Sequence, residues 1–317
     1  MSSIKNVIIA GATGSVGTPI LKALLSEPSL NITILTRASS SAKFPANIPV
    51  KEVSDEFTVE ELTQAFKGQD AVVVAISTTP VTKEGRDGLA FRLIDAAVAA
   101  GIKRFIPSEY GANNLDPRAR SLVPVYDRKG EMLEYLITKA KESNGALTWS
   151  SIACGSWLDW ALDPSRSGNF LGIDIKARTA RVYDSGRARY AITSSSNTGL
   201  AVVRALLKPE LSENKQIFLA DFTTTTRDII ESLETQTEEM FTIDQRDSAT
   251  EIKGLREKFD AGDFNATYPL LGISFGADVD VGYDFEKEQK VWNADLGLPK
   301  ATLDEAVKAA IEISKRQ

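Results

Sequence analysis

The chain has 317 residues, of which 43% are hydrophobic and 25% charged, a composition typical of a folded globular protein and not of a disordered or collagen-like one. It contains no histidine and a single cysteine, Cys154, which excludes histidine-dependent nucleophile triads, HExxH zinc sites and an intramolecular disulfide. A net charge of −6 argues against nucleic acid or an anionic membrane as the partner, and no residue spacing suggests a metal site.

No apolar run approaches the roughly 18 residues that a membrane-spanning helix needs. The first apolar run, residues 7–10, is also too short for the core of a signal peptide. We therefore expect a cytoplasmic protein with no membrane partner.

The first half of the chain alternates short apolar runs with amphipathic helical patterns. Strands are expected at 7–10, 31–36, 50–53, 71–76, 104–107 and 147–152, and helices at 19–25, 59–66, 89–100 and 127–143. Repeated strand–helix–strand units take right-handed crossovers. This alternation therefore predicts an α/β fold with a doubly wound parallel Rossmann sheet in the order 3-2-1-4-5-6.

The regular alternation of strands and helices ends at about residue 155. A loop-rich aromatic stretch is expected at 159–172, a hairpin or irregular sheet at 178–192, a helix at 197–207, a strand at 216–219, a polar lead-in at 223–226, and helices at 227–234 and 302–315. Thr302 and Glu305 have the spacing of a capping box. We expect a dinucleotide-binding domain at 1–155, to which 191–220 returns, and a smaller, partly intertwined substrate lobe formed by 156–190 and 221–317.

A glycine-rich turn separates the first predicted strand from the first helix. Its proposed cofactor-binding residues are Gly11, Thr13, Gly14, Ser15, Val16 and Gly17. Glycines permit a tight turn and a close backbone approach to a pyrophosphate, and the helix N-terminus adds free N–H donors. The alternative is a structural turn with no ligand.

Arg37 ends the second predicted strand, twenty positions after Gly17. An acidic residue there would bind a ribose 2′-hydroxyl, whereas a guanidinium matches a 2′-phosphate. Four further donors could follow in the next residues, which are Ser39, Ser40, Ser41 and Lys43. We therefore expect NADP(H) as the cofactor, the alternative being a solvated arginine after a strand.

Polar residues also follow the fourth and fifth predicted strands. Ser77 and Thr78 come after the fourth, and Ser108 after the fifth. Ligands of open α/β sheets bind at the carboxyl ends of the strands. These three residues are therefore expected to border the cofactor, although a Ser/Thr turn at Ser77 and Thr78 is equally ordinary.

Lys129 begins the apolar stripe of the helix expected at 127–143 and is our candidate catalytic residue. An inward-facing lysine can reach the cleft above the sheet, where removal from water favours the neutral amine and makes proton exchange possible near neutral pH. The alternative is a lysine that lies along the helix with its amine in water. Tyr126 stands three residues earlier, one short of the usual Tyr-x-x-x-Lys spacing, so we do not assign that pair.

Aromatic side chains are the candidates for substrate contacts. They are Tyr110, Tyr126, Trp157 and Trp160. Aromatic rings can line a pocket for an aromatic substrate, but packing in a protein core is the alternative for each.

The glycine turn, Arg37, the run Lys-Arg-Phe-Ile-Pro-Ser-Glu-Tyr-Gly at 103–111 and Lys129 together resemble the NmrA-like atypical short-chain dehydrogenases. The branch is similar to the isoflavone reductase-like group, with the phenylcoumaran benzylic ether and pinoresinol–lariciresinol reductases and their fungal relatives. The resemblance covers most of the chain. It implies that NADPH reduces a small and often aromatic secondary metabolite. It also implies that Lys129 contacts the cofactor and acts as the general acid–base.

The chain departs from the family pattern at Ala90, where a glutamine is frequent, at Ala153, where an asparagine is frequent, and in the loop after Glu109. We therefore do not expect this chain to share the substrates of the plant enzymes. Two alternatives stay open: a dinucleotide-binding redox sensor without turnover, and a cofactor-bound enzyme of a redox-neutral reaction. We expect a small-molecule partner and a monomer or homodimer.

Overall fold

A computed structural model of the chain describes residues 4–77 and 88–315. The chain divides into two units that each gather several segments. The first unit contains Met1–Tyr110, Arg128–Ala153 and Ser196–Ile217, and the second contains Gly111–Asp127, Cys154–Ser195 and Phe218–Gln317.

The first unit is built on a seven-stranded sheet in the order β10-β6-β5-β4-β1-β2-β3. Its strands are β1 (Asn6–Ala10), β2 (Asn31–Arg37), β3 (Val50–Val53), β4 (Ala71–Val74), β5 (Arg104–Ile106), β6 (Thr148–Ala153) and β10 (Lys215–Phe218). From β3 to β6 each strand runs parallel to its neighbour. The predicted order 3-2-1-4-5-6 is confirmed, and β10 extends the sheet beyond β6.

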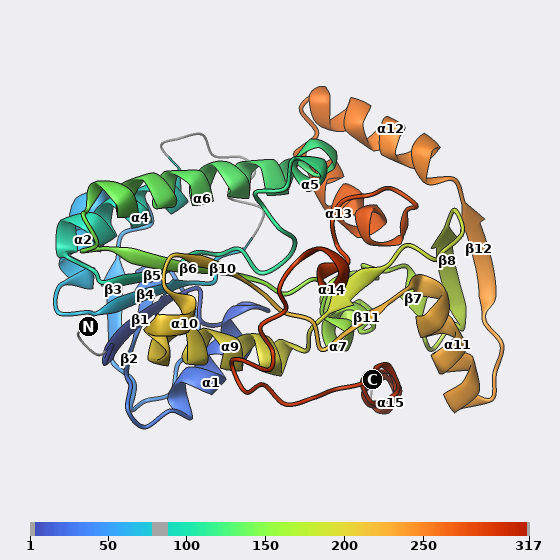
Figure 1. Cartoon of the computed structure of the whole chain (residues 1–317), viewed down its shortest axis with the longest axis horizontal. Helices are drawn as coiled ribbons and strands as arrows, with labels where there is room; N and C mark the ends of the chain where they lie inside the picture. Colours follow the sequence, from blue (N-terminus) through green and yellow to red (C-terminus); the bar gives the residue numbers. More distant parts are fainter. Residues whose placement is uncertain (1–3, 78–87, 316–317) are drawn as a thin grey trace. The chain divides into compact units, whose positions relative to one another are not determined.

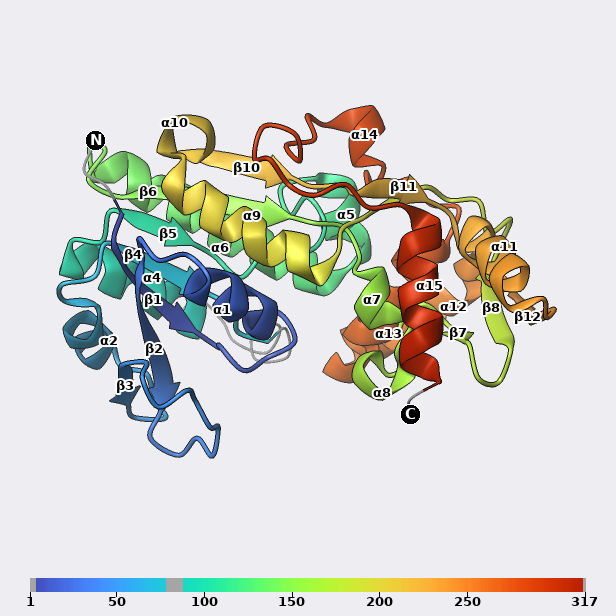
Figure 2. The ribbon, with the colours of Figure 1, turned by 90° about the horizontal axis from the view of Figure 1, so that it is seen from below.

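Helices cover both faces of this sheet, as a doubly wound fold requires (Figures 1 and 2). One face carries α2 (Val59–Phe66), α4 (Leu89–Ala100) and α6 (Pro124–Glu142), and the other carries α1 (Gly17–Leu25) and α9 (Ser195–Leu207), which α10 (Pro209–Ser212) follows. Because β1 is enclosed on both sides, Val7, Ile8 and Ile9 are fully buried. Their uninterrupted apolar run is the pattern that predicted this strand.

Arg104 of β5 is a buried charge in the first unit, with 2% of its surface exposed. Its Nε donates to Thr148 Oγ1 at 2.8 Å, and one terminal nitrogen donates to Ser150 Oγ at 3.1 Å and Ser212 Oγ at 3.0 Å. Burial lowers the pKa of this guanidinium, and the nearby carboxylate of Glu213 opposes that effect. Arg104 thus links β5, β6 and the turn before β10 through hydrogen bonds inside the core.

We expect Arg104→Leu to lower the free energy of unfolding by about 2–4 kcal/mol, because it removes several charge-assisted bonds at a buried position. Urea unfolding followed by circular dichroism measures this loss. The control is Lys103→Ala, since Lys103 forms a surface ion pair with Asp70 at 2.7 Å and its side chain is 43% exposed. That change should cost less than about 1 kcal/mol. Equal losses for the two variants would contradict the structural role of Arg104.

The second unit contains two small sheets. β9 (Tyr190–Ile192) pairs antiparallel with β11 (Phe222–Thr224), while β8 (Thr179–Tyr183) lies between β7 (Ile173–Asp174) and β12 (Thr242–Arg246). Its helices are α5 (Pro117–Leu122), α7 (Leu158–Ala161), α8 (Pro164–Ser167), α11 (Thr226–Thr237), α12 (Ser248–Asp260), the 3-10 helix η1 (Phe264–Ala266), α13 (Thr267–Gly276), α14 (Phe285–Glu288) and α15 (Leu303–Ser314). One apolar core joins α5, α7, α11, α15 and the small sheets.

The structure differs from several of these expectations. Of the two alternatives for residues 178–192 the hairpin is wrong, because β8 and β9 belong to different small sheets, and the irregular sheet is nearer to the structure. The stretch 159–172 contains α7 and α8, and the polar lead-in contains β11. Gly111–Asp127 lies in the second unit because Ala112, Ala119, Val123 and Tyr126 pack in its core. The capping box of Thr302 and Glu305 is confirmed.

Candidate active site

The glycine turn brings β1 against the end of β4. Gly11 has a left-handed φ of 84°, and a Cβ there would lie 2.5 Å from the backbone oxygen of Ala75. A Cβ on Gly17 would lie 2.0 Å from the backbone oxygen of Gly11. A side chain on Gly11 would therefore push the turn away from the end of β4, and one on Gly17 would push the start of α1 away from the turn.

The turn also presents the N-terminus of α1. Among the described residues no side chain caps this helix, whose first turn follows Val16, and Thr13, Gly14 and Ser15 are exposed beside it. Uncapped N–H groups and the helix dipole favour a bound anion. A Cβ on Gly14 would make only an ordinary contact, 3.5 Å from the Gly11 oxygen, so the glycine leaves open space at the surface of the turn. These features fit the pyrophosphate of a dinucleotide.

Arg37 ends β2 with an exposed side chain. Among the described residues no carboxylate forms an ion pair with it. Ser39, which we considered as an additional donor, instead gives its hydroxyl proton to Asp55 Oδ1 at 2.7 Å. The guanidinium remains available to a ligand at this strand end.

Lys129 lies on α6 and is 8% exposed. Its Nζ donates to the backbone oxygen of Glu109 at 2.6 Å, which ties α6 to the segment that follows β5. Leu133 and Leu136 continue the same stripe and are fully buried. The apolar stripe therefore points inward, as the spacing predicted, and it carries the lysine inward with it.

Ser108 joins the ends of two neighbouring strands. Its Oγ donates to the backbone oxygen of Ile76, which follows β4, at 2.8 Å. Ser77 is exposed at the same strand end, whereas Thr78 lies outside the described residues. The structure thus brings the glycine turn, the end of β4, Ser108 and Lys129 to one edge of the sheet through successive contacts.

A cavity opens at this edge beside Lys129. Its polar lining comes from Ser108, Glu109 and Lys129. Apolar side chains form the rest of the wall; they include Ile76, Leu89, Leu93, Ile94, Phe105 and Met132. A mostly apolar cavity with a few convergent polar groups is the usual form of a small-molecule site.

The aromatic candidates have different surroundings. Tyr110, in the first unit, has a left-handed φ of 37° and donates its backbone N–H to Ile152 at 2.9 Å. In the second unit, Tyr126 is 3% exposed, Trp157 is 7% exposed, and the ring of Trp160 packs 5.3 Å from that of Phe170. Burial and the neighbouring Tyr283 hold the pKa of Tyr126 well above its usual range.

One contact that the sequence analysis missed is the backbone oxygen of Glu109, which holds Lys129. A backbone acceptor leaves no mark in the residue pattern. The nearest signal is the position of Glu109, two residues after the end of the strand expected at 104–107.

Comparisons with known proteins agree with this geometry. The NAD(P)H-binding family matches residues 11–166, a segment that begins at the glycine turn. Oxidoreductase aprR of Aspergillus flavus is 32% identical over 307 residues, which is 96% of this chain and 98% of that protein. Oxidoreductase poxI of Penicillium oxalicum is 31% identical and covers 96% of this chain and 93% of its own length.

Solved structures share the fold at lower identity. The isoflavone reductase structure has a TM-score of 0.71 at 18% identity and covers 96% of this chain and 99% of its own. The complex of leucoanthocyanidin reductase from Vitis vinifera with NADPH has a TM-score of 0.74 at 17% identity and covers 97% and 99%.

The fold and the glycine turn define an NAD(P)H-binding protein of the Rossmann type. The chain belongs to the NmrA-like family of NAD(P)-binding oxidoreductases. In the part of the chain that the structure describes, no helix is long and apolar enough to cross a membrane. Within the same residues, no group of three or more acidic or cysteine side chains is placed to hold a metal ion.

Two glycine substitutions separate folding from cofactor binding. We expect Gly17→Ala to lower the free energy of unfolding by more than about 2 kcal/mol, because its Cβ has no room beside Gly11. Gly14→Ala should unfold like the parent protein and yet bind NADPH at least about tenfold more weakly, because its methyl group occupies the exposed surface of the turn. Thermal unfolding and a fluorescence titration with NADPH check the two outcomes. Unchanged NADPH affinity in Gly14→Ala would contradict the placement of the phosphates.

Proposed function

We propose that this protein is an NADPH-dependent reductase of a small aromatic or polyketide-type or alkaloid-type metabolite, with Lys129 as the general acid. The observation that carries the proposal is the position of Lys129, buried on α6, bonded to the Glu109 oxygen, and lining the cavity at the ends of β4 and β5. Family membership supports an oxidoreductase, and a relative of 28% identity is named asnovolin J 5′,6′-dehydrogenase of Aspergillus novofumigatus.

The choice of NADPH over NADH rests on Arg37 at the end of β2. Its exposed guanidinium would pair with the 2′-phosphate, while the N-terminus of α1 and the glycine turn would hold the pyrophosphate. Similar folds have been solved with NADP⁺ and with NADPH, which agrees with this choice. When bound, the reduced nicotinamide would supply a hydride to an electrophilic carbon of the substrate.

Lys129 would hold the proton that this transfer requires. An ammonium has three N–H donors, so the bond to the Glu109 oxygen can orient the group while it faces the cavity. As negative charge develops on the substrate, Lys129 would donate a proton to it, directly or through water. The apolar wall formed by Leu93, Phe105 and Met132 would exclude bulk water and favour an apolar substrate.

Lys129→Ala tests the proposed acid. We expect turnover to fall about 100-fold or more, the usual contribution of a general acid, with NADPH affinity kept within about threefold. The measurement is NADPH oxidation with aromatic ketones, enones and benzylic ethers, alongside a binding titration. Lys139→Ala is the matched control, since Lys139 lies on the same helix and pairs with Glu142 at the surface.

Turnover that survives unchanged in Lys129→Ala would remove the lysine from the mechanism. Tight NADPH binding without turnover of any compound, together with a stable complex with a regulatory protein, would favour the redox sensor over the reductase.

Arg37→Ala tests the cofactor preference. We expect NADPH binding to weaken by about 1.5–3 kcal/mol, the size of hydrogen bonds to a charged group, while NADH binding barely changes. Isothermal titration with each nucleotide measures the two affinities. Equal losses for NADPH and NADH would place Arg37 away from the 2′-phosphate.

A further inference from the structure

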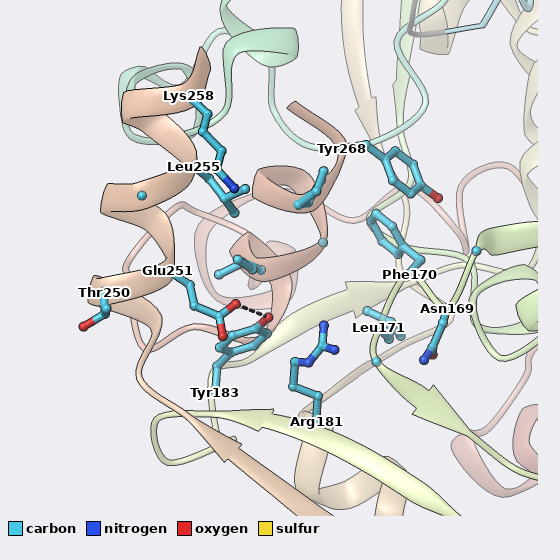
Figure 3. Close-up of a pocket in the computed structure, with 16 residues that line it drawn as sticks. Asn169, Phe170, Leu171, Arg181, Tyr183, Thr250, Glu251, Leu255, Lys258 and Tyr268 are labelled. Atoms are coloured by element: carbon cyan, nitrogen blue, oxygen red, sulfur yellow. Dashed lines mark hydrogen bonds between the residues drawn. The ribbon is translucent and has the colours of Figure 1, made fainter. Parts of the chain in front are cut away.

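The second unit contains a cavity of about 460 Å³ that shares no residue with the one beside Lys129. Its wall is formed by α12, α13, β8 and the loop at 168–172, all within the second unit (Figure 3). The volume is in the range of sites that hold small organic molecules.

Aromatic and aliphatic side chains form one side of the cavity. The rings of Phe170 and Tyr268 lie 5.4 Å apart at an angle of 51°. Tyr268 is anchored, because its hydroxyl donates to the backbone oxygen of Ser167 at 2.7 Å. Leu171 and Ile273 add buried apolar surface. This side is suited to a ring or a short aliphatic body.

Two cations face the same space. Figure 3 shows Lys258 of α12 and Arg181 of β8 extending into the cavity from different elements. Among the described residues Lys258 has no ion-pair partner. Arg181 lies 3.7 Å from Asp244, but Arg246 holds that carboxylate more closely, at 2.9 Å. Arg181 is therefore held only by a long ion pair, and Lys258 by none among the described residues.

The acidic residue of the wall already has partners. Glu251 accepts a hydrogen bond from the Tyr183 hydroxyl at 3.0 Å and lies 3.8 Å from Arg246. Burial raises the pKa of Tyr183, and that of Tyr268 to about 12, so neither phenol adds negative charge near neutral pH. The charges of the wall are thus two cations and one carboxylate, in a chain whose net charge is −6.

We propose that this cavity binds a small organic monocarboxylate with an apolar, ring-containing body, its carboxylate between Arg181 and Lys258 and its ring against Phe170 and Tyr268. A guanidinium matches a carboxylate in shape, and Glu251 disfavours a ligand with two negative charges. The proposal does not depend on the role given to Lys129, because the two cavities share no lining residue.

The cavity can be blocked at a position that tolerates a side chain. Gly254 shares the stripe of α12 with Glu251 and Lys258, and a Cβ there meets nothing within 4 Å. Gly254→Leu should therefore project a bulky side chain into the space beside Lys258 without disturbing the fold. Gly254→Ala is its control, since one methyl group leaves most of the space.

The experiment is calorimetric titration of the purified full chain with 3-phenylpropanoate, compared with its neutral analogue 3-phenylpropanamide. We expect saturable binding of the acid below about 10 mM and at least about tenfold weaker binding of the amide. Arg181→Gln and Lys258→Gln should each weaken binding of the acid about five- to tenfold. Gly254→Leu should abolish its binding, and Gly254→Ala should retain it.

Lys253→Gln is the charge-matched control, because Lys253 is exposed on the same helix and does not line the cavity. Its affinity for the acid should equal that of the parent protein. Absence of saturable binding, equal affinity for acid and amide, or equal losses in Lys253→Gln and Lys258→Gln would each overturn the proposal. Lys129→Ala should bind the acid normally, which separates this site from the proposed reductase site.

Discussion

The first unit depends on the close approach of the glycine turn to the carboxyl end of β4. Gly11 lies against Ala75 at a distance that no side chain permits, and Gly17 packs against Gly11 in the same way. Because β1, β4 and β5 are parallel, this approach places the N-terminus of α1 at the edge where Ser108 bonds to Ile76. The groups proposed to bind phosphate and the cavity beside Lys129 therefore share one edge of one sheet.

The sheet of the first unit could be predicted from sequence because its signals are local. Buried parallel strands have continuous apolar runs, as residues 7–10 do, and Gly101 ends α4 in the left-handed conformation that glycine favours. The second unit lacks such signals. β12 is polar and mostly exposed, and it pairs with β8, whose residues lie about sixty positions earlier in the chain. Its pairing therefore depends on tertiary contacts that no short pattern records.

The candidate site also has parts that the sequence could predict and parts that it could not. The inward position of Lys129 could be predicted because its place on an apolar stripe is a property of the helix itself. Its backbone partner at Glu109 could not be found, since every residue has a carbonyl oxygen and the fold alone decides which one a lysine reaches. The cavity lined by Arg181 and Lys258 is even harder to predict from the sequence, because four separate segments form it and the sequence of each resembles that of ordinary surface.

The absence of histidine leaves lysine and tyrosine as the candidates for proton transfer near neutral pH. Tyr126 precedes Lys129 by three residues, but its hydroxyl lies in the core of the second unit, and a Cβ on Gly111 would come within 3.2 Å of it. Burial raises the pKa of this phenol, so it releases its proton less readily than a phenol in water and is a weaker acid. Lys129 instead lines a cavity, and its Nζ is held by a backbone oxygen. The lysine therefore reaches a cavity from a fixed position, whereas the phenol packs in the core of the second unit, and this difference is the physical ground for proposing the lysine as the acid.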